Sequence, residues 1–149
     1  MAFLQTSDAH AGVNGKDAFY KLKEKHQDEM RSRFDLWKRG EQRTAKYFHG
    51  FDQEGYRECF VFKRKQAGTY YRFYGFLFNP KQKTDPRYRV CILVQCVIKN
   101  TENTDLRELD FVNSLRTHPA VKAAIQKEFP EDREGDHAPL HSQKRPSIH

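Results

Sequence analysis

The chain has 149 residues, of which 37% are hydrophobic, 32% charged and 13% aromatic, and its formal net charge is +7. This length fits one domain and is short for two. No apolar run approaches the roughly 18 residues of a membrane span, and the N-terminus lacks the pattern of a secretory signal. Three cysteines do not make a disulfide framework. We therefore expect a cytoplasmic protein without a membrane partner.

The first regular pattern in the chain is helical. Asn14 is a candidate N-cap, and Gly40 is a candidate stop. Between them apolar side chains recur at spacings of three and four: Phe19, Leu22, His26, Met30, Phe34 and Trp37. This pattern fits one helix or two, although no glycine or proline marks a break. Residues 1–13 are predicted to be a flexible N-terminus, in which Phe3 and Leu4 could add a short edge strand.

Three strands are predicted next. Residues 56–65 alternate in strand fashion, Ala67-Gly68 is a turn signal, and residues 69–78 complete a hairpin. After a polar loop, residues 87–99 form the strongest strand, and one of its faces is predicted to carry Val90, Ile92, Val94, Cys96 and Ile98. Cys91 and Cys96 are then predicted to face opposite sides, so they cannot share a metal ion. No metal site and no cofactor are expected.

Helices are predicted again after the strands. Asp105 and Glu108 resemble a capping box, and Pro119 suits the first turn of a further helix. Residues 130–149 have almost no apolar side chains and are predicted to be a disordered tail. The order of a helix, consecutive strands and then helices predicts a single α+β domain over residues 14–129, with a small antiparallel sheet.

The positive charge is concentrated in one part of the sequence. Residues 63–89 contain eight basic residues and one acidic residue, so this window has the whole net charge of +7. Seven tyrosines and phenylalanines are interleaved with them. Clustered cations attract polyanions, and aromatic rings stack on bases. Basic side chains could equally keep an aromatic-rich sheet in solution, but the localised excess favours RNA as a partner.

Arg72 is the strongest candidate within this window. It shares a predicted strand face with Tyr70 and Tyr74, and a guanidinium at a sheet surface can hold a phosphate by a two-point contact. The structural alternative is an ion pair with Glu58 across the hairpin. Lys99 ends the strongest strand, and its structural alternative is a solvated lysine.

The succession of short motifs resembles the RelE/HigB-type toxin superfamily, in particular its phage-derived RelE-like branch. The motifs are Tyr56-Arg57-Glu58-Cys59, Tyr71-Arg72-Phe73-Tyr74, the apolar run 92–98 followed by Lys99-Asn100-Thr101, and Leu106-Arg107-Glu108-Leu109. The resemblance implies a compact antiparallel sheet with helices on one face. It also implies a metal-independent endoribonuclease that cleaves mRNA, often on the ribosome, and is controlled by an antitoxin.

In such a protein the 2′-hydroxyl of RNA attacks the neighbouring phosphate while cations stabilise the developing charge. The resemblance and the charge pattern together assign catalytic roles to Lys63, Lys65, Arg72 and Lys99. They assign RNA binding to Arg64, Tyr74, Arg87 and Arg89, with Tyr74 stacking on a base.

Two positions depart from the family pattern, because Phe60 and Asn100 replace basic residues. This loss of two cations favours the alternative functions. One is a non-catalytic RNA- or ribosome-binding module on the same fold. The other is a protein-interaction module whose basic surface meets an acidic partner.

Overall fold

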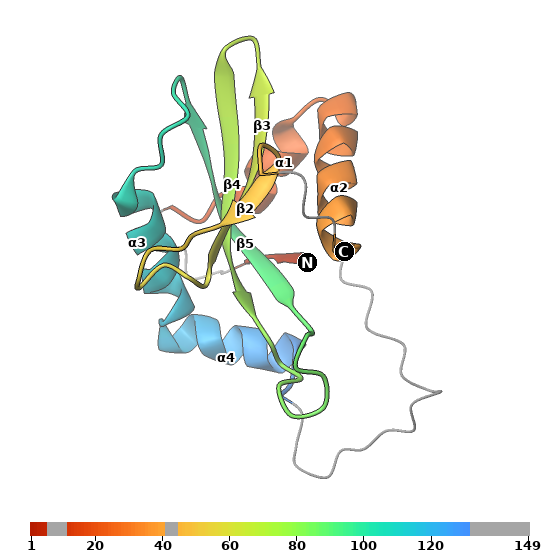
Figure 1. Ribbon diagram of the computed structural model, residues 1–149, viewed down its shortest axis with the longest axis vertical. Helices are drawn as coiled ribbons and strands as arrows, with labels where there is room; N and C mark the ends of the chain where they lie inside the picture. Colours follow the sequence, from red (N-terminus) through yellow and green to blue (C-terminus); the bar gives the residue numbers. More distant parts are fainter. Residues whose placement is uncertain (6–11, 41–44, 132–149) are drawn as a thin grey trace.

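The computed structural model describes residues 1–5, 12–40 and 45–131 (Figure 1). This part of the chain is α+β, as predicted. Its elements are β1 (Ala2–Phe3), α1 (Gly15–Lys21), α2 (Glu24–Lys38), β2 (Phe48–Gly50), β3 (Cys59–Gln66), β4 (Thr69–Phe78), β5 (Val90–Lys99), α3 (Leu106–Arg116) and α4 (Pro119–Glu128). No described helix combines the length and the apolar character that crossing a lipid bilayer requires. Most of the predicted tail lies outside the described residues.

The five strands form one sheet in the order β1-β5-β4-β3-β2. β1 pairs with β5 in parallel, and the other pairs are antiparallel, so the sheet is mixed rather than antiparallel as predicted. The short edge strand expected at Phe3 and Leu4 is present as β1, one residue earlier. Ala2 and Phe3 pair with Ile92 and Leu93, because this pairing satisfies backbone groups at the β5 edge and buries apolar side chains.

The N-terminal helical stretch is divided into two helices. α1 ends at Lys21, and Leu22 has an extended backbone with φ −65° and ψ 150°. The Gln27 side chain donates a hydrogen bond to the Leu22 carbonyl at 2.9 Å, so a residue of α2 satisfies a carbonyl released at the break. Asn14 occupies the N-cap position of α1, but its side-chain amide hydrogen-bonds to the backbone of Cys96 instead.

The predicted hairpin is confirmed between β3 and β4. Both turn residues have positive φ, 48° at Ala67 and 81° at Gly68, as a tight two-residue turn between twisted strands requires. β4 has the predicted bounds. β3 begins at Cys59 rather than at Tyr56, because the Tyr56 carbonyl accepts a turn hydrogen bond from the Cys59 amide.

An irregularity in the pairing of β4 with β5 reverses the alternation of β5. Tyr74 pairs with Gln95, whereas the next residue, Gly75, pairs with Leu93, so Val94 is the extra residue of a β-bulge. One extra residue exchanges the two faces of the strand for every residue that follows. From Gln95 onward, a side chain that regular alternation would place on the α3 side of the sheet therefore lies on the α2 side, and the reverse.

The bulge corrects two sequence predictions about β5. Cys96 does not share a face with Val90, because it belongs to the cluster that packs against α2. Cys91 belongs to that same cluster, so the two cysteines do not face opposite sides. In the part of the chain that the structure describes, no group of three or more His, Cys, Asp or Glu residues is placed to hold a metal ion.

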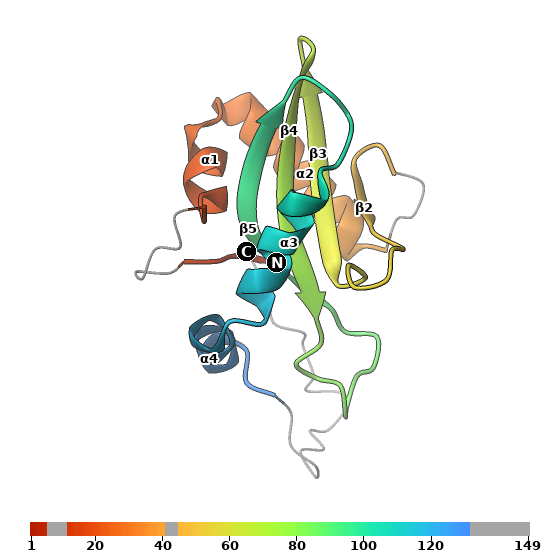
Figure 2. The ribbon, with the colours of Figure 1, turned by 90° about the vertical axis from the view of Figure 1, so that its left-hand side faces the viewer.

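Helices cover both faces of the sheet, whereas the family resemblance implies helices on one face (Figure 2). The α2 face is mostly aromatic and contains Phe19, Phe34, Phe48, Phe60, Phe62 and Phe73. The α3 face is mostly aliphatic and contains Val61, Val90, Ile92, Val94, Leu109, Val112 and Leu115. Each face therefore has its own core, and a charged residue of β3 or β4 meets a different environment on each side.

Candidate nucleic-acid interface

The end of the sheet at the β3–β4 turn brings together all four predicted catalytic residues, since Lys99 of β5 lies opposite Tyr70 of β4. Lys63 lies opposite Arg72, and Lys65 lies opposite Tyr70. Directly opposed residues of antiparallel strands share a face, and residues two apart in one strand share it as well. Lys63, Lys65 and Arg72 therefore project from the same face, which is the α3 face.

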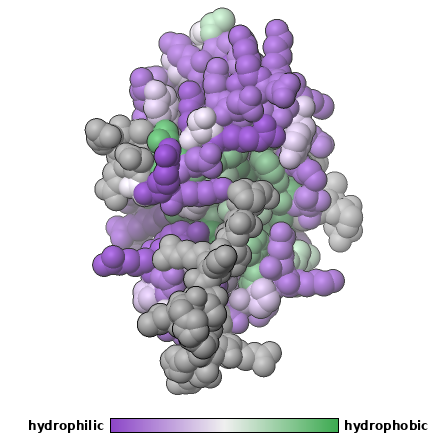
Figure 3. Space-filling view, turned by 90° about the vertical axis from the view of Figure 1, so that its right-hand side faces the viewer, coloured by the Kyte–Doolittle hydropathy of each residue, from purple (hydrophilic) through white to green (hydrophobic). Residues whose placement is uncertain are grey.

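A hollow of about 260 Å³ lies at this end of the sheet, and we call it the hairpin-end pocket. It is lined by Arg33, Lys46, Tyr47, Lys63, Arg64, Lys65, Tyr70, Arg72 and Glu102. Six of these residues are basic and one is acidic. Figure 3, which views the α2 side of Figure 1, shows hydrophilic residues gathered over the upper part of the molecule, where the hairpin lies. The lining of the pocket is therefore strongly basic.

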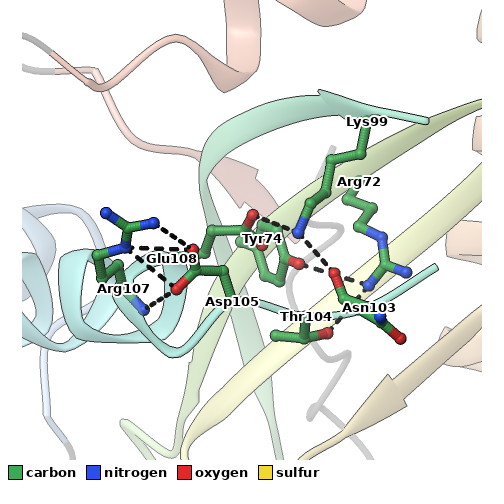
Figure 4. Close-up of polar contacts among 8 residues, drawn as sticks. All are labelled: Arg72, Tyr74, Lys99, Asn103, Thr104, Asp105, Arg107 and Glu108. Atoms are coloured by element: carbon green, nitrogen blue, oxygen red, sulfur yellow. Dashed lines mark hydrogen bonds and ion pairs between the residues drawn. The ribbon is translucent and has the colours of Figure 1, made fainter. Parts of the chain in front are cut away.

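Arg72 is buried in this pocket without a counter-ion. It is 2% exposed, and its Nη1 donates to the hydroxyls of Thr104 at 3.0 Å and Tyr74 at 3.5 Å (Figure 4). Its Nε is buried and has no hydrogen-bond partner, and no carboxylate of the described residues forms an ion pair with it. Burying a charge without an opposite charge costs stability, so the Arg72 guanidinium has unused capacity to bind an anion.

The predicted structural alternative for Arg72 is wrong. Glu58 does not pair with Arg72, which lies opposite Lys63 in the register of β3 and β4. Glu58 precedes β3 at its other end, where its carboxylate lies 4.0 Å from the guanidinium of Arg116. Two cations therefore face each other where the alternative required a cation and an anion.

The two lysines of the pocket differ in burial. Lys63 is half-buried, and burial together with the Arg72 guanidinium lowers the pKa of its ammonium below the usual value. Lys65 is exposed and lies 5.2 Å from the centre of the Tyr70 ring. Lys63 is thus the partly desolvated charge of the pair, and Lys65 is a solvated charge beside an accessible ring.

Arg64, which was predicted to bind RNA, has its guanidinium on the opposite face. It donates to the Glu29 carboxylate and to the Gln66 side chain, both at 2.8 Å, and to Nδ1 of His26. Its side chain also lies over the ring of Tyr71. The charge of Arg64 is therefore neutralised within the protein, and this residue fastens β3 to α2.

Lys99 and Tyr74 also differ from their predicted roles. The Lys99 ammonium is 2.6 Å from the Glu108 carboxylate and donates to the Asn103 carbonyl at 2.5 Å, so it ties β5 to α3 rather than being a solvated or an RNA-contacting lysine. Tyr74 is fully buried, and burial raises the pKa of its hydroxyl to about 12. The buried ring of Tyr74 cannot stack on a base, whereas the partly exposed Tyr70 can.

Arg87 and Arg89, the last two residues predicted to bind RNA, are not brought to the pocket. They precede β5, next to the end of β4 that lies away from the turn. The six-residue step from Arg72 to Phe78, the last residue of β4, spans roughly 20 Å and separates them from Arg72 and Lys63. Arg89 donates hydrogen bonds to the carbonyls of Pro86 and Tyr88, within its own loop.

Three residues near the pocket were missed by the sequence analysis: Arg33, Lys46 and His49. Arg33 donates to the Lys63 carbonyl at 2.6 Å and lies 4.7 Å from the centre of the Tyr47 ring. Its spacing of three residues from Met30 places it beside the apolar stripe of α2, and this signal could have indicated contact with the sheet. Lys46 and His49 belong to a segment without a periodic pattern.

Comparison with family models, with curated proteins and with solved structures finds no match to this chain. Its function therefore has to be inferred from the chemistry of the hairpin-end pocket.

Proposed function

We propose that this protein binds RNA through the hairpin-end pocket and cleaves it without a metal ion, as a RelE/HigB-like toxin-type endoribonuclease. One observation carries the proposal, which is the buried Arg72 guanidinium, for which residues 1–5, 12–40 and 45–131 provide no counter-ion. A phosphodiester supplies the missing negative charge, and its two free oxygens match the planar donor array of an arginine.

Further features of the pocket favour a nucleic acid over a small anion. Lys46 and Lys65 are exposed at its margin and can contact neighbouring phosphates along a strand. Tyr70 presents a partly exposed ring for a base. Repeated phosphate contacts beside a stacking ring are typical of proteins that bind single strands.

The charges of the pocket suit cleavage by the 2′-hydroxyl of the RNA itself. In-line attack on the adjacent phosphorus builds negative charge on the phosphoryl oxygens, and Arg72 and Lys63 would stabilise that charge. Lys63, with its lowered pKa, can protonate the leaving 5′-oxygen. The products would carry a 2′,3′-cyclic phosphate and a 5′-hydroxyl. An antitoxin would inhibit the reaction by placing acidic side chains in the same pocket.

Two observations favour a second candidate function, which is RNA or ribosome binding without cleavage. Lys99 is occupied by Glu108, and Tyr74 is buried, so two of the family's expected contacts with RNA are unavailable here. Both candidates use Arg72 to bind phosphate, and they differ only in whether the bound strand is broken.

The test is binding and cleavage of a single-stranded RNA by the full chain in EDTA. For RNA binding, the logarithm of affinity should fall linearly with the logarithm of salt concentration, by about 0.7 per phosphate contact. Arg72→Met should weaken binding about 10-fold or more and slow cleavage about 100-fold. The matched control is Arg57→Met, which removes an exposed arginine that precedes β3 at its far end. Tight binding without cyclic-phosphate product would support the second candidate, and salt-independent binding would contradict both.

A further inference from the structure

His49 lies in β2, beside the cation pair of the hairpin-end pocket and on the same face of the sheet. Its partner in β3 is Val61, and Val61 and Lys63 share the α3 face because they are two residues apart. Lys63 in turn lies opposite Arg72. His49 thus occupies the row next to Lys63 and Arg72, at the edge of the sheet where β2 has no further strand.

The hydrogen bonding of His49 leaves one ring nitrogen available as a base. Nδ1 is 2.7 Å from the carbonyl oxygen of Gly50. A carbonyl can only accept, so Nδ1 carries the proton, and in the neutral ring the lone pair is on Nε2. No described residue hydrogen-bonds to Nε2. The ring of Phe51 lies 5.0 Å away and packs against the imidazole, which restricts its rotation.

We propose that His49 is the general base of the cleavage reaction, a role that rests on the proposed function. Nε2 accepts the proton of the 2′-hydroxyl as the O2′–P bond forms. The P–O5′ bond breaks, and the 5′-oxygen takes a proton from the Lys63 ammonium. One proton is gained by His49 and one is lost by Lys63, and exchange with water restores both residues.

The electrostatic surroundings keep His49 in the form that this step needs. Burial lowers the pKa of its imidazole, and the charges of Lys63 and Arg72 lower it further, whereas the hydrogen bond to Gly50 opposes them. Because the resulting pKa lies below 6.5, the ring is neutral at neutral pH. The same cations that bind the phosphate thus keep the base deprotonated.

The experiment compares wild type, His49→Ala and a control, His118→Asn, which keeps an N-cap residue at the start of α4. RNA affinity and cleavage in EDTA are measured for each protein. We expect His49→Ala to bind RNA as wild type does and to cleave it about 100-fold more slowly. Added imidazole should restore part of the lost rate in His49→Ala and leave the control unchanged.

The outcomes separate this inference from the proposed function. If wild type cleaves and His49→Ala cleaves equally fast, His49 is not the base, and the proposed function stands. If wild type binds RNA but forms no cyclic phosphate, both the cleavage and the role of His49 are overturned. Loss of RNA binding in His49→Ala, without rescue by imidazole, would assign the residue to the binding surface and overturn its role as a base.

A second measurement does not depend on cleavage. The pKa of His49, followed by NMR, should rise in Arg72→Met, because removing a nearby cation makes the imidazolium less unfavourable. It should also rise when an uncleavable 2′-deoxy strand binds, since the phosphates offset the charges of Lys63 and Arg72. A pKa that changes in neither case would show that His49 does not sense the pocket, and the inference would fail.

Discussion

Arg64 and Arg72 lie in neighbouring strands of one hairpin and are almost equally buried, at 3% and 2% exposure, but their guanidinium groups lie on opposite faces of the sheet. On the α2 face, Arg64 meets the Glu29 carboxylate at 2.8 Å. On the α3 face, the hydrogen-bond partners of Arg72 within the described part of the chain are the hydroxyls of Thr104 and Tyr74. Burial alone therefore does not distinguish a structural arginine from a functional one.

The difference lies in what the covering helix supplies. α2 places an acidic side chain over Arg64, and its charge is balanced within the fold. The start of α3 also has a carboxylate, that of Glu108, but it pairs with Lys99. Arg72 therefore contacts the neutral hydroxyl groups of Thr104 and Tyr74 instead of a negative charge. A charge that the fold does not balance is available to a ligand, and the predictions below test whether the two arginines differ in this way.

The largest effect is expected at the bulge, which determines the residues of β5 that lie next to Arg72. A Cβ at Gly75 would lie 2.2 Å from the carbonyl oxygen of Ile92. Gly75→Ala should therefore force the strands apart and lower the free energy of unfolding by about 3 kcal/mol. Gly68→Ala is the control, because its Cβ meets nothing within 4 Å and only the positive φ costs about 1 kcal/mol. Equal losses in urea unfolding would contradict the close contact.

Arg64→Met should produce the next largest effect. It removes charge-assisted hydrogen bonds to Glu29 and others to Gln66 and His26, which should lower the free energy of unfolding by about 2–3 kcal/mol. Glu29→Gln removes the same ion pair, so the double variant should lose less free energy of unfolding than the sum of the two single losses. Strict additivity would show that the ion pair contributes nothing to the stability of the α2 face.

Arg72→Met should behave differently, although it removes an equally buried guanidinium. An apolar side chain of similar volume relieves an unbalanced charge, so in buffer without phosphate or sulfate the stability should stay within about 1 kcal/mol of wild type or increase. Inorganic phosphate at ten times its dissociation constant should stabilise wild type by about 1.4 kcal/mol and leave the variant unchanged. A loss as large as that of Arg64→Met would make Arg72 a structural residue.

The pH dependence should be the smallest effect, and it concerns the α2 face. Burial and Arg64 lower the pKa of His26 below its usual 6.5, and Arg64 lowers the pKa of Glu29 below 4.5. A histidine with a depressed folded pKa contributes full stability above pH 6.5 and loses it as the pH falls towards the folded value. Glu29 adds a further loss below pH 4.5.

Unfolding free energies measured across this range should therefore decrease on acidification in wild type and decrease less steeply in His26→Asn, which keeps an acceptor for Arg64. An unchanged slope in the variant would show that His26 titrates alike in the folded and unfolded chain.

The features predicted correctly from the sequence depend on residues that are close together in the chain. The bounds of β4, the turn at Ala67 and Gly68, and Pro119 as the first residue of α4 are of this kind. Asp105 accepts a hydrogen bond from the Arg107 amide, which confirms the N-cap half of the predicted capping box, whereas the Glu108 carboxylate pairs with Lys99. In each case the backbone conformation is decided within a few residues, so the local sequence is sufficient.

Long-range pairing explains the errors in the predicted sheet. The parallel β1–β5 pair joins residues about 90 positions apart in the chain, and no local pattern specifies it. The bulge depends on how β4 and β5 meet, and the run 90–98, which is apolar except for Gln95, has no alternation that could reveal it. Helices cover both faces because each face of the sheet has its own set of apolar side chains. The composition of a single strand does not show whether one face or both faces will be covered.

For the site, the sequence by itself determined the concentration of positive charge and the faces within a single strand, such as that of Arg72 with Tyr70 and Tyr74, because charge is a property of composition and strand alternation is local. The register of β3 against β4 put Lys63 and Lys65 on the face of Arg72, and this register belongs to the tertiary structure. Only the tertiary structure decided which cations are balanced. Glu29 reaches Arg64 from 35 residues away, Glu108 reaches Lys99 across an element boundary, and neither reaches Arg72. Coulomb interactions depend on distance in space and on burial, and folding decides both.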